Sequence, residues 1–232
     1  MQYIYSKIRR CASDYNMIPP GARVAVGVSG GKDSLLLLAG LAGLRRFWPG
    51  GFELEAITLD MGMKGMDLSP VERFCENLDV PLTIIKTQIA EIVFDIRKES
   101  HPCSLCAKMR RGALHQAAIE RNCRIVALGH HMDDAIETFM LSLLYEGRLS
   151  CFRPVTYLDR QDITLIRPLL YIEESDVLAR VSQLPVVHNP CPANGHTKRQ
   201  EVKERLRAME TEVSDVRQKV FGSLRSLPGW AR

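Results

Sequence analysis

Short apolar runs alternate with amphipathic stretches between residues 23 and 145. The runs predict buried strands at 23–28, 52–59, 82–86 and 124–128, because strands buried on both faces are apolar throughout. The amphipathic stretches, with apolar residues three or four positions apart, predict helices at 33–46, 69–78, 104–121 and 131–145. Alternation of this kind is typical of an α/β fold, a doubly wound parallel sheet with helices on both faces.

The pattern changes after residue 147. One more strand is expected at 163–166, and helices are expected at 173–183, 198–209 and 212–226. We therefore divide the chain into a helical N-terminal extension (1–20), an α/β core (21–150) and a C-terminal part (151–232). The C-terminal part is expected to pack its strand and helices on the core.

A glycine turn joins the first strand to the first helix of the core. It contains, in order, Ser29, Gly30, Gly31, Lys32, Asp33 and Ser34. The glycines allow a tight bend and close approach of a ligand, and a helix N-terminus favours an anion. Lys32 adds a positive charge, so the turn predicts a phosphate site. It is no Walker A loop, since Asp33 follows the lysine and Val26 stands where a glycine is required, and it lacks the Gly-x-Gly-x-x-Gly pattern.

Two further polar segments follow predicted strands. Asp60 comes after the second strand, and Gly129, His130 and His131 come after the fourth. Ligands bind at the carboxyl ends of parallel strands, so these residues are expected near the phosphate loop. Asp133 and Asp134 lie in the first turn of the next helix, where carboxylates favour helix formation. Either they only start that helix, or one of them helps to hold Mg²⁺ on a nucleotide; the histidines fit ordinary turn residues.

The chain has seven cysteines. Cys103 and Cys106 form a C-x-x-C pair, which alone fits a redox pair, half a zinc site or iron–sulfur ligation. A zinc ribbon needs a second such pair, which the sequence lacks, and the fold is not thioredoxin-like. Cys191 lies between two prolines, in a rigid turn suited to presenting a thiolate. Three thiolates would hold a [4Fe–4S] cluster and leave one iron open. The other four cysteines fit buried or incidental thiols.

Composition adds little beyond the motifs. The chain is 46% hydrophobic and 25% charged, with a formal net charge of +4, as in ordinary globular proteins. It has no apolar run long enough to span a membrane and no signal-peptide pattern at its start, so we expect a cytoplasmic protein. Its basic residues gather in clusters that either contact nucleic acid or form solvated helix faces. Two of these clusters are Lys108, Arg110 and Arg111, and Lys198 and Arg199.

Taken together, these motifs resemble the tRNA-cytidine 2-sulfurtransferase family of the PP-loop ATP pyrophosphatase superfamily. The matching segments are Ser29–Ser34, Cys103–Gly112, Ala127–Asp134, Ile166–Leu169 and Pro190–Cys191. The resemblance implies an enzyme whose substrate is tRNA. It would use ATP, Mg²⁺ and a [4Fe–4S] cluster held by Cys103, Cys106 and Cys191. Lys32 and Asp33, with the three cysteines, would carry the chemistry. The phosphate loop, Asp60, Gly129, His130, Asp133 and Asp134 would bind the nucleotide, and the two basic clusters would bind RNA.

The implied reaction has two stages. A base carbonyl oxygen, expected at C2 of an anticodon-loop cytidine, attacks the α-phosphate of ATP, and sulfur then replaces the activated oxygen. The expected partners are tRNA and a sulfur donor such as a cysteine desulfurase; a homodimer is the assembly to test, and no membrane is expected. Two alternatives stay open. One is thiolation of a tRNA uridine, and the other is an adenylating ligase or amidating enzyme without a cluster.

Overall fold

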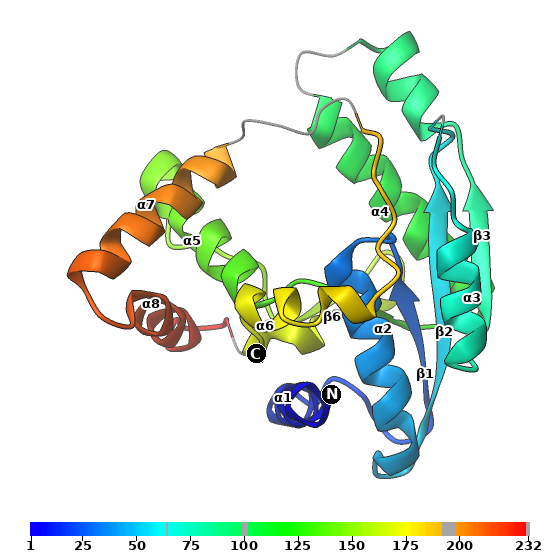
Figure 1. The fold of residues 1–232 in the computed structure, drawn as a ribbon, viewed down its shortest axis with the longest axis horizontal. Helices are drawn as coiled ribbons and strands as arrows, with labels where there is room; N and C mark the ends of the chain where they lie inside the picture. The colour runs from blue at the N-terminus through cyan, green and yellow to red at the C-terminus, as the bar shows by residue number, and fades with distance from the viewer. Residues whose placement is uncertain (64, 99–101, 192–197, 231–232) are drawn as a thin grey trace.

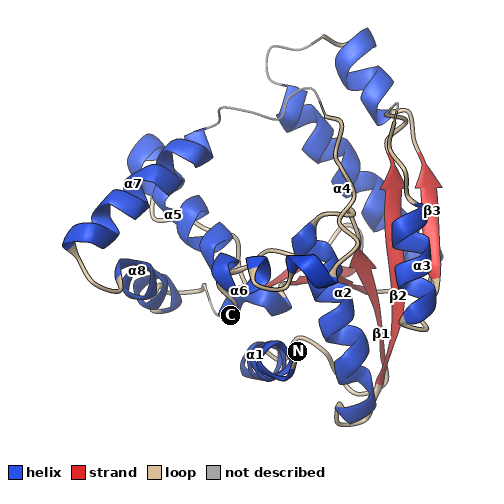
Figure 2. Cartoon of the chain, viewed as in Figure 1, coloured by secondary structure: helices blue, strands red, loops and turns tan. Residues whose placement is uncertain are grey.

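The computed structural model describes residues 1–63, 65–98, 102–191 and 198–230. Its centre is a six-stranded sheet in the order β3-β2-β1-β4-β6-β5 (Figures 1 and 2). Five strands are parallel, and the edge strand β5 pairs antiparallel with β6. The strands are β1 (Ala22–Gly27), β2 (Phe52–Asp60), β3 (Leu82–Lys86), β4 (Ile125–Ala127), β5 (Val155–Leu158) and β6 (Ile163–Ile166).

Helices cover both faces of this sheet (Figure 2). They are α1 (Gln2–Asp14), α2 (Lys32–Leu44), α3 (Ser69–Asn77), α4 (Pro102–Glu120), α5 (Met132–Glu146), α6 (Glu174–Leu178), α7 (Lys198–Glu212) and α8 (Val216–Arg225). Short 3₁₀ turns occupy Arg45–Phe47, Pro168–Tyr171 and Val181–Gln183, and a π-helical turn occupies Glu91–Ile96.

The alternation of side chains along β1 explains the two layers. Val24 and Val26 join the large core that also contains buried residues of α1, α2, α3 and α5. Ala25 points to the opposite face, where it packs with Ala117 and Ala118 of α4. Because successive strand residues face opposite sides, an apolar strand such as β1 needs cover on both faces. The predicted doubly wound α/β fold is thereby confirmed.

Three local expectations were incomplete. The edge strand β5 was not predicted; its residues are half-buried or, like Tyr157, exposed, and only pairing with β6 makes the segment a strand. The π-helical turn was also missed. The helix expected at 173–183 is instead a short α6 followed by a 3₁₀ turn. It ends early where the Arg180 guanidinium donates to the carbonyl of Asp176 at 2.8 Å.

Within the described ranges, no helix is both long enough and apolar enough to cross a membrane.

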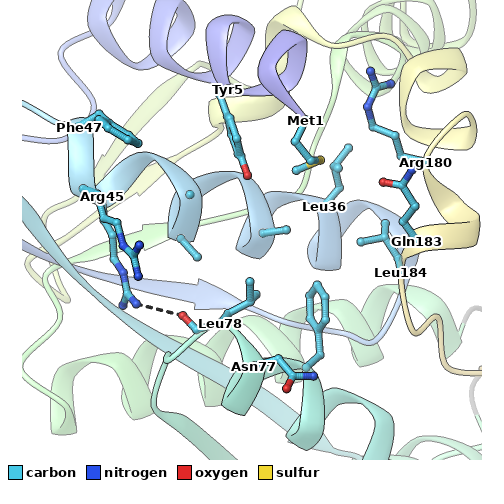
Figure 3. Close-up of a pocket in the computed structure, with 15 residues that line it drawn as sticks. Met1, Tyr5, Leu36, Arg45, Phe47, Asn77, Leu78, Arg180, Gln183 and Leu184 are labelled. Atoms are coloured by element: carbon cyan, nitrogen blue, oxygen red, sulfur yellow. Dashed lines mark hydrogen bonds between the residues drawn. The ribbon is translucent and has the colours of Figure 1, made fainter.

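A cavity of about 470 Å³ lies beside the C-terminal part of α2 (Figure 3). Tyr5 and Leu36 line it together with Leu78 and Leu184, and the Arg45 guanidinium at its edge donates to the Leu78 carbonyl at 3.0 Å. Among the described residues that line this cavity, none belongs to the three sequence motifs. We therefore look for chemistry at the carboxyl edge of the sheet instead.

Candidate functional site

A second cavity, of about 550 Å³, lies at the carboxyl ends of β1, β2 and β4. This is where the strand order changes direction, since β2 and β4 lie on opposite sides of β1. Open α/β sheets bind their ligands at such a point. Three walls are formed by the phosphate loop, by the segment after β4, and by α4. A fourth is formed by Val187 and Asn189, which precede Cys191.

The phosphate loop is held open by hydrogen bonds among its own residues. The backbone N–H of Ser29 donates to the Ser34 hydroxyl at 3.1 Å, and that hydroxyl donates to the Gly31 carbonyl at 2.9 Å. Gly30 has a φ of +78°, which a residue with a side chain rarely adopts. The loop therefore curls around the N-terminus of α2, where free N–H groups favour an anion.

Two glycines allow other segments to approach this loop closely. A Cβ atom on Gly129 would lie 3.0 Å from the Ser34 nitrogen, and one on Gly30 would lie 3.0 Å from the Val187 Cβ. The Val187 N–H also donates to the Gly30 carbonyl at 2.9 Å. The segment after β4 and the segment before Cys191 are thus both packed against the phosphate loop.

Lys32 is turned away from the cavity. Its ammonium lies 2.9 Å from Asp33 Oδ1 and 3.5 Å from Glu174 Oε1, and Lys32 is absent from the cavity lining, whereas Asp33 belongs to it. Burial lowers the pKa of Lys32, but the hydrogen bond and charge of Asp33 and the charge of Glu174 outweigh it and raise that pKa. Lys32 is therefore charged and would have to leave Glu174 to reach a phosphate.

Asp133 and Asp134 have different surroundings. Asp133 is buried; its Oδ1 accepts from Arg217 at 2.6 Å and its Oδ2 from the Glu174 N–H at 2.7 Å, so it ties α5 to α6 and α8. Asp134 lines the cavity, and its Oδ2 accepts from the His131 N–H at 3.0 Å. Of the two, Asp134 fits a ligand of Mg²⁺ on a bound nucleotide, because it lines the cavity and Asp133 does not.

The basic residues at the start of α7 are engaged with side chains of α5. Arg199 lies 3.3 Å from Asp134 Oδ1 and 3.0 Å from Glu137 Oε2. The Lys198 ammonium lies 4.8 Å from the centre of the Tyr145 ring. Assignment of these two residues to RNA stays a prediction, and Arg199 would have to leave two carboxylates to make such a contact.

Sequence reasoning missed two acidic residues of this network, Glu137 and Glu174. Glu137, 1% exposed, faces Arg199 and Lys203. Glu174 accepts from the Lys203 ammonium at 2.7 and 2.9 Å. Burial raises the pKa of Glu174, but Lys203 together with Lys32 and His131 holds it below its usual value. Their positions in charged, helical stretches gave no signal that distinguishes them from a solvated face.

The three predicted cysteines belong to two segments that line the cavity, α4 and the segment that leads to Cys191, although none of the three lines it. Cys103 and Cys106 lie in the first turns of α4, and next to them Ala107 and Arg110 line the cavity. Burial raises the pKa of the Cys106 thiol, Arg110 lowers it, and the charges of Cys191 and Cys103 raise it again. Cys191 thus contributes to the electrostatic surroundings of Cys106, although the two are far apart in sequence.

The three side chains are all thiols, the donors that hold iron–sulfur clusters in proteins. Within the described ranges, no three metal-binding side chains converge closely enough to hold one ion. Each thiolate of a cubane cluster binds a different iron, so its ligand sulfurs lie farther apart than the ligands of one ion. The apolar side chains of Leu105 and Met109 pack with Cys106 on a small buried cluster, which provides partial shielding from solvent.

His130 and Asp60 complete the predicted nucleotide set. His130 lines the cavity, and its ring lies 4.9 Å from that of Phe152. Burial, and next the charge of Arg167, lower the pKa of His130 to about 4, so the imidazole is neutral at neutral pH. Asp60 ends β2, where its Oδ1 accepts from the Gly62 N–H at 2.9 Å. Its neighbours Leu59 and Met61 line the cavity, whereas Asp60 itself does not.

Comparison with known proteins agrees with this geometry. A family model described as a PP-loop domain matches residues 4–209. A tRNA-cytidine(32) 2-sulfurtransferase of Pelobacter propionicus is 38% identical over 94% of this chain and 82% of its own. That of Geobacter sulfurreducens is 36% identical over 95% of this chain and 89% of its own. The chain belongs to the tRNA-cytidine(32) 2-sulfurtransferase family. The family and the PP-loop domain predicted from the sequence are thereby confirmed.

Solved structures place the family among the PP-loop folds. The U34-tRNA thiolase NcsA of Methanococcus maripaludis, solved with its [4Fe-4S] cluster, matches with a TM-score of 0.77 and 25% identity. The match covers 98% of this chain and 80% of the thiolase. An NH₃-dependent NAD synthetase of Campylobacter jejuni matches with a TM-score of 0.55 and 18% identity, over 97% of this chain and 91% of its own, and shows the common fold alone.

The role of Asp133 as a structural anchor can be tested by a double-mutant cycle. Asp133→Asn keeps an acceptor for the Glu174 N–H but leaves the largely buried Arg217 with one carboxylate, that of Glu210, instead of two. We expect the free energy of unfolding to fall by about 2–4 kcal/mol in urea denaturation. Arg217→Ala should cost a similar amount, and the double variant much less than the sum. If the two single losses in the free energy of unfolding simply add in the double variant, the pairing is contradicted. Asp159→Asn, at an exposed position, is the control.

Proposed function

We propose that this chain is an ATP-dependent, iron–sulfur-dependent tRNA thiolase. It adenylates the C2 carbonyl oxygen of an anticodon-loop cytidine and replaces that oxygen with sulfur. The observation that carries the proposal is a shared cavity, with the phosphate loop on one wall and the residues beside Cys106 and Cys191 on two others. A base in this cavity lies between the group that would activate its carbonyl and the thiolates.

The phosphate loop would hold the polyphosphate of ATP. Its N–H groups and the Ser29 and Ser34 hydroxyls surround the start of α2, and they stabilise the negative charge that grows on departing pyrophosphate. Asp134 would hold Mg²⁺ on the same phosphates. Lys32 would move from Glu174 toward the pyrophosphate. The ion pair with the pyrophosphate would then replace the ion pair with Glu174.

Cys103, Cys106 and Cys191 would hold the [4Fe–4S] cluster. When bound, the cluster supplies sulfur at the ring carbon of the activated base. Arg110 lies beside Cys106 and lines the cavity, so its guanidinium favours the thiolate form that metal binding requires.

RNA would approach over α4. Lys108 and Arg110 are exposed there, and Arg111, also exposed, lines the cavity with Arg110. An anticodon-loop base is single-stranded, so it can be turned out of its stack at little cost. A sulfur donor such as a cysteine desulfurase, a cytoplasmic location and a homodimer belong to the same proposal.

The first test concerns the products. With Mg²⁺ and tRNA, the protein should convert ATP to AMP and pyrophosphate. Lys32→Ala removes the ammonium beside the loop, and we expect a rate lower by about 100-fold, the usual cost of lost charge stabilisation. Chromatography of labelled ATP measures both. Lys86→Ala, at an exposed position on the edge strand β3, is the control and should leave the rate unchanged. ADP and phosphate as products would refute the proposal.

The second test concerns the cluster. Protein purified without oxygen should be brown and contain about four irons per chain, as three thiolate ligands and one open site predict. Alanine at Cys103, Cys106 or Cys191 should remove iron and thiolation but leave ATP binding unchanged. Cys123→Ala is the control, since that thiol is buried in the apolar core that α4 covers. Iron retained in Cys191→Ala would mean that the third ligand lies elsewhere.

The third test concerns RNA. Arg110→Ala should weaken tRNA binding. It should also make the slope of log K against log salt concentration shallower, by about 0.7 to 0.9 for each phosphate that the protein no longer neutralises. Filter binding at several salt concentrations measures this slope. Arg124→Ala, exposed just before β4 at the edge of the sheet opposite the cavity, is the control with the same change of charge. An unchanged slope combined with loss of iron would show that Arg110 serves the thiolates rather than RNA.

A further inference from the structure

A thiolase of this kind must distinguish cytidine from uridine. The two bases share the C2 carbonyl but differ at N3, which accepts a hydrogen bond in cytosine and donates one in uracil. An enzyme that reads a base turned out of its stack does so along this edge. A neutral hydrogen-bond donor facing N3 would therefore favour cytidine.

Most polar groups that line the cavity do not suit this task. The Ser29 and Ser34 hydroxyls lie 3.2 Å apart and are hydrogen-bonded within the phosphate loop. Asp33 and Asp134, as carboxylates, can only accept. These four side chains belong to the nucleotide end of the cavity.

The other polar lining residues lie nearer the cysteines. Arg110 and Arg111 carry a charge suited to phosphate, and the Arg111 Nε donates to the Ala107 carbonyl at 3.2 Å. His130 is half-buried; its ring is tilted by 33° to that of Phe152, and its Nδ1 is enclosed in the wall, out of reach of a ligand. Asn189 remains, a neutral side chain with one acceptor and two donor hydrogens.

The orientation of Asn189 is determined by its neighbour. Its Oδ1 accepts from the backbone N–H of Cys191 at 3.1 Å, so its NH₂ group is the half that can donate to a ligand. Two residues before it, the Val187 N–H is bound to the Gly30 carbonyl of the phosphate loop. Asn189 therefore lies on the wall that joins the phosphate loop to the third cysteine, along the path between the two stages of the reaction.

We propose that the NH₂ group of Asn189 donates to N3 of the target cytidine and thereby selects cytidine over uridine. This inference rests on the proposed function. Asn189 is exposed in the free protein, so the discrimination arises once a bound base covers it. A uracil would then leave the NH₂ group facing the N3–H donor without a partner.

Asn189→Asp tests the inference with a minimal change. The carboxylate still accepts the Cys191 N–H, but it cannot donate to N3 of cytosine and can accept from N3–H of uracil. Two tRNA transcripts that differ only in cytidine or uridine at the modified position are the substrates, and mass spectrometry of nucleosides measures thiolation. We expect the cytidine rate to fall by about 10- to 100-fold and the cytidine-to-uridine ratio to fall at least as much.

The matched control is His188→Asp. It places the same charge one residue away, at an exposed position outside the cavity lining. This variant should keep the wild-type preference for cytidine. Iron content and ATP binding, measured on both variants, show whether the Cys191 turn and the phosphate loop are intact.

A measurement on the wild-type protein covers the case in which Asn189→Asp loses iron. A transcript with 3-deazacytidine at the modified position lacks the N3 acceptor, and we expect it to bind about 10-fold more weakly than the cytidine transcript. Equal affinity for the two transcripts, or an unchanged cytidine-to-uridine ratio in an iron-containing Asn189→Asp protein, would overturn the inference. Failure of the proposed function is a separate result, since the wild-type protein would then thiolate neither transcript.

Discussion

The close approach of three backbone segments at the phosphate loop is the constraint on which the rest of the site depends. Gly129 leaves room for Ser34, and Gly30 leaves room for Val187. A side chain at either glycine would push apart two walls of the cavity. Because Val187 is two residues before Asn189 and four before Cys191, the same contact also fixes the start of the segment that leads to Cys191. The nucleotide wall and the thiolate wall are therefore parts of one packed unit.

This unit must also neutralise the negative charge of its own carboxylates. Four carboxylates, Asp133, Asp134, Glu137 and Glu174, lie near a cavity that must accept a polyphosphate. Unpaired, they would repel it, and the buried ones would destabilise the fold. Arg199, Lys203 and Arg217 of α7 and α8 pair with all four. The C-terminal helices thus neutralise carboxylates beside the cavity without lining it, which gives a physical reason for their position against α5.

Much of this was predictable from the sequence, because local patterns carry it. Apolar runs located β1, β2, β3, β4 and β6, and the glycine turn and the C-x-x-C pair identified two walls of the site. The rest depends on contacts between distant segments. The edge strand β5 exists through pairing with β6, and the engagement of Arg199 depends on how α7 lies along α5. A run of basic and acidic residues looks the same whether it faces solvent or buried carboxylates.

Solved structures that share this fold belong to enzymes with different reactions. A tRNA thiolase and an NH₃-dependent NAD synthetase both match this fold, so the scaffold alone does not determine the reaction. In this chain, the nucleotide end is formed by backbone groups and short side chains at the ends of β1 and β4. The opposite end is formed by side chains of α4 and of the segment before Cys191. These segments are not part of the sheet, so their residues can change the acceptor or the attacking group while the strands, and with them the phosphate loop, stay in place.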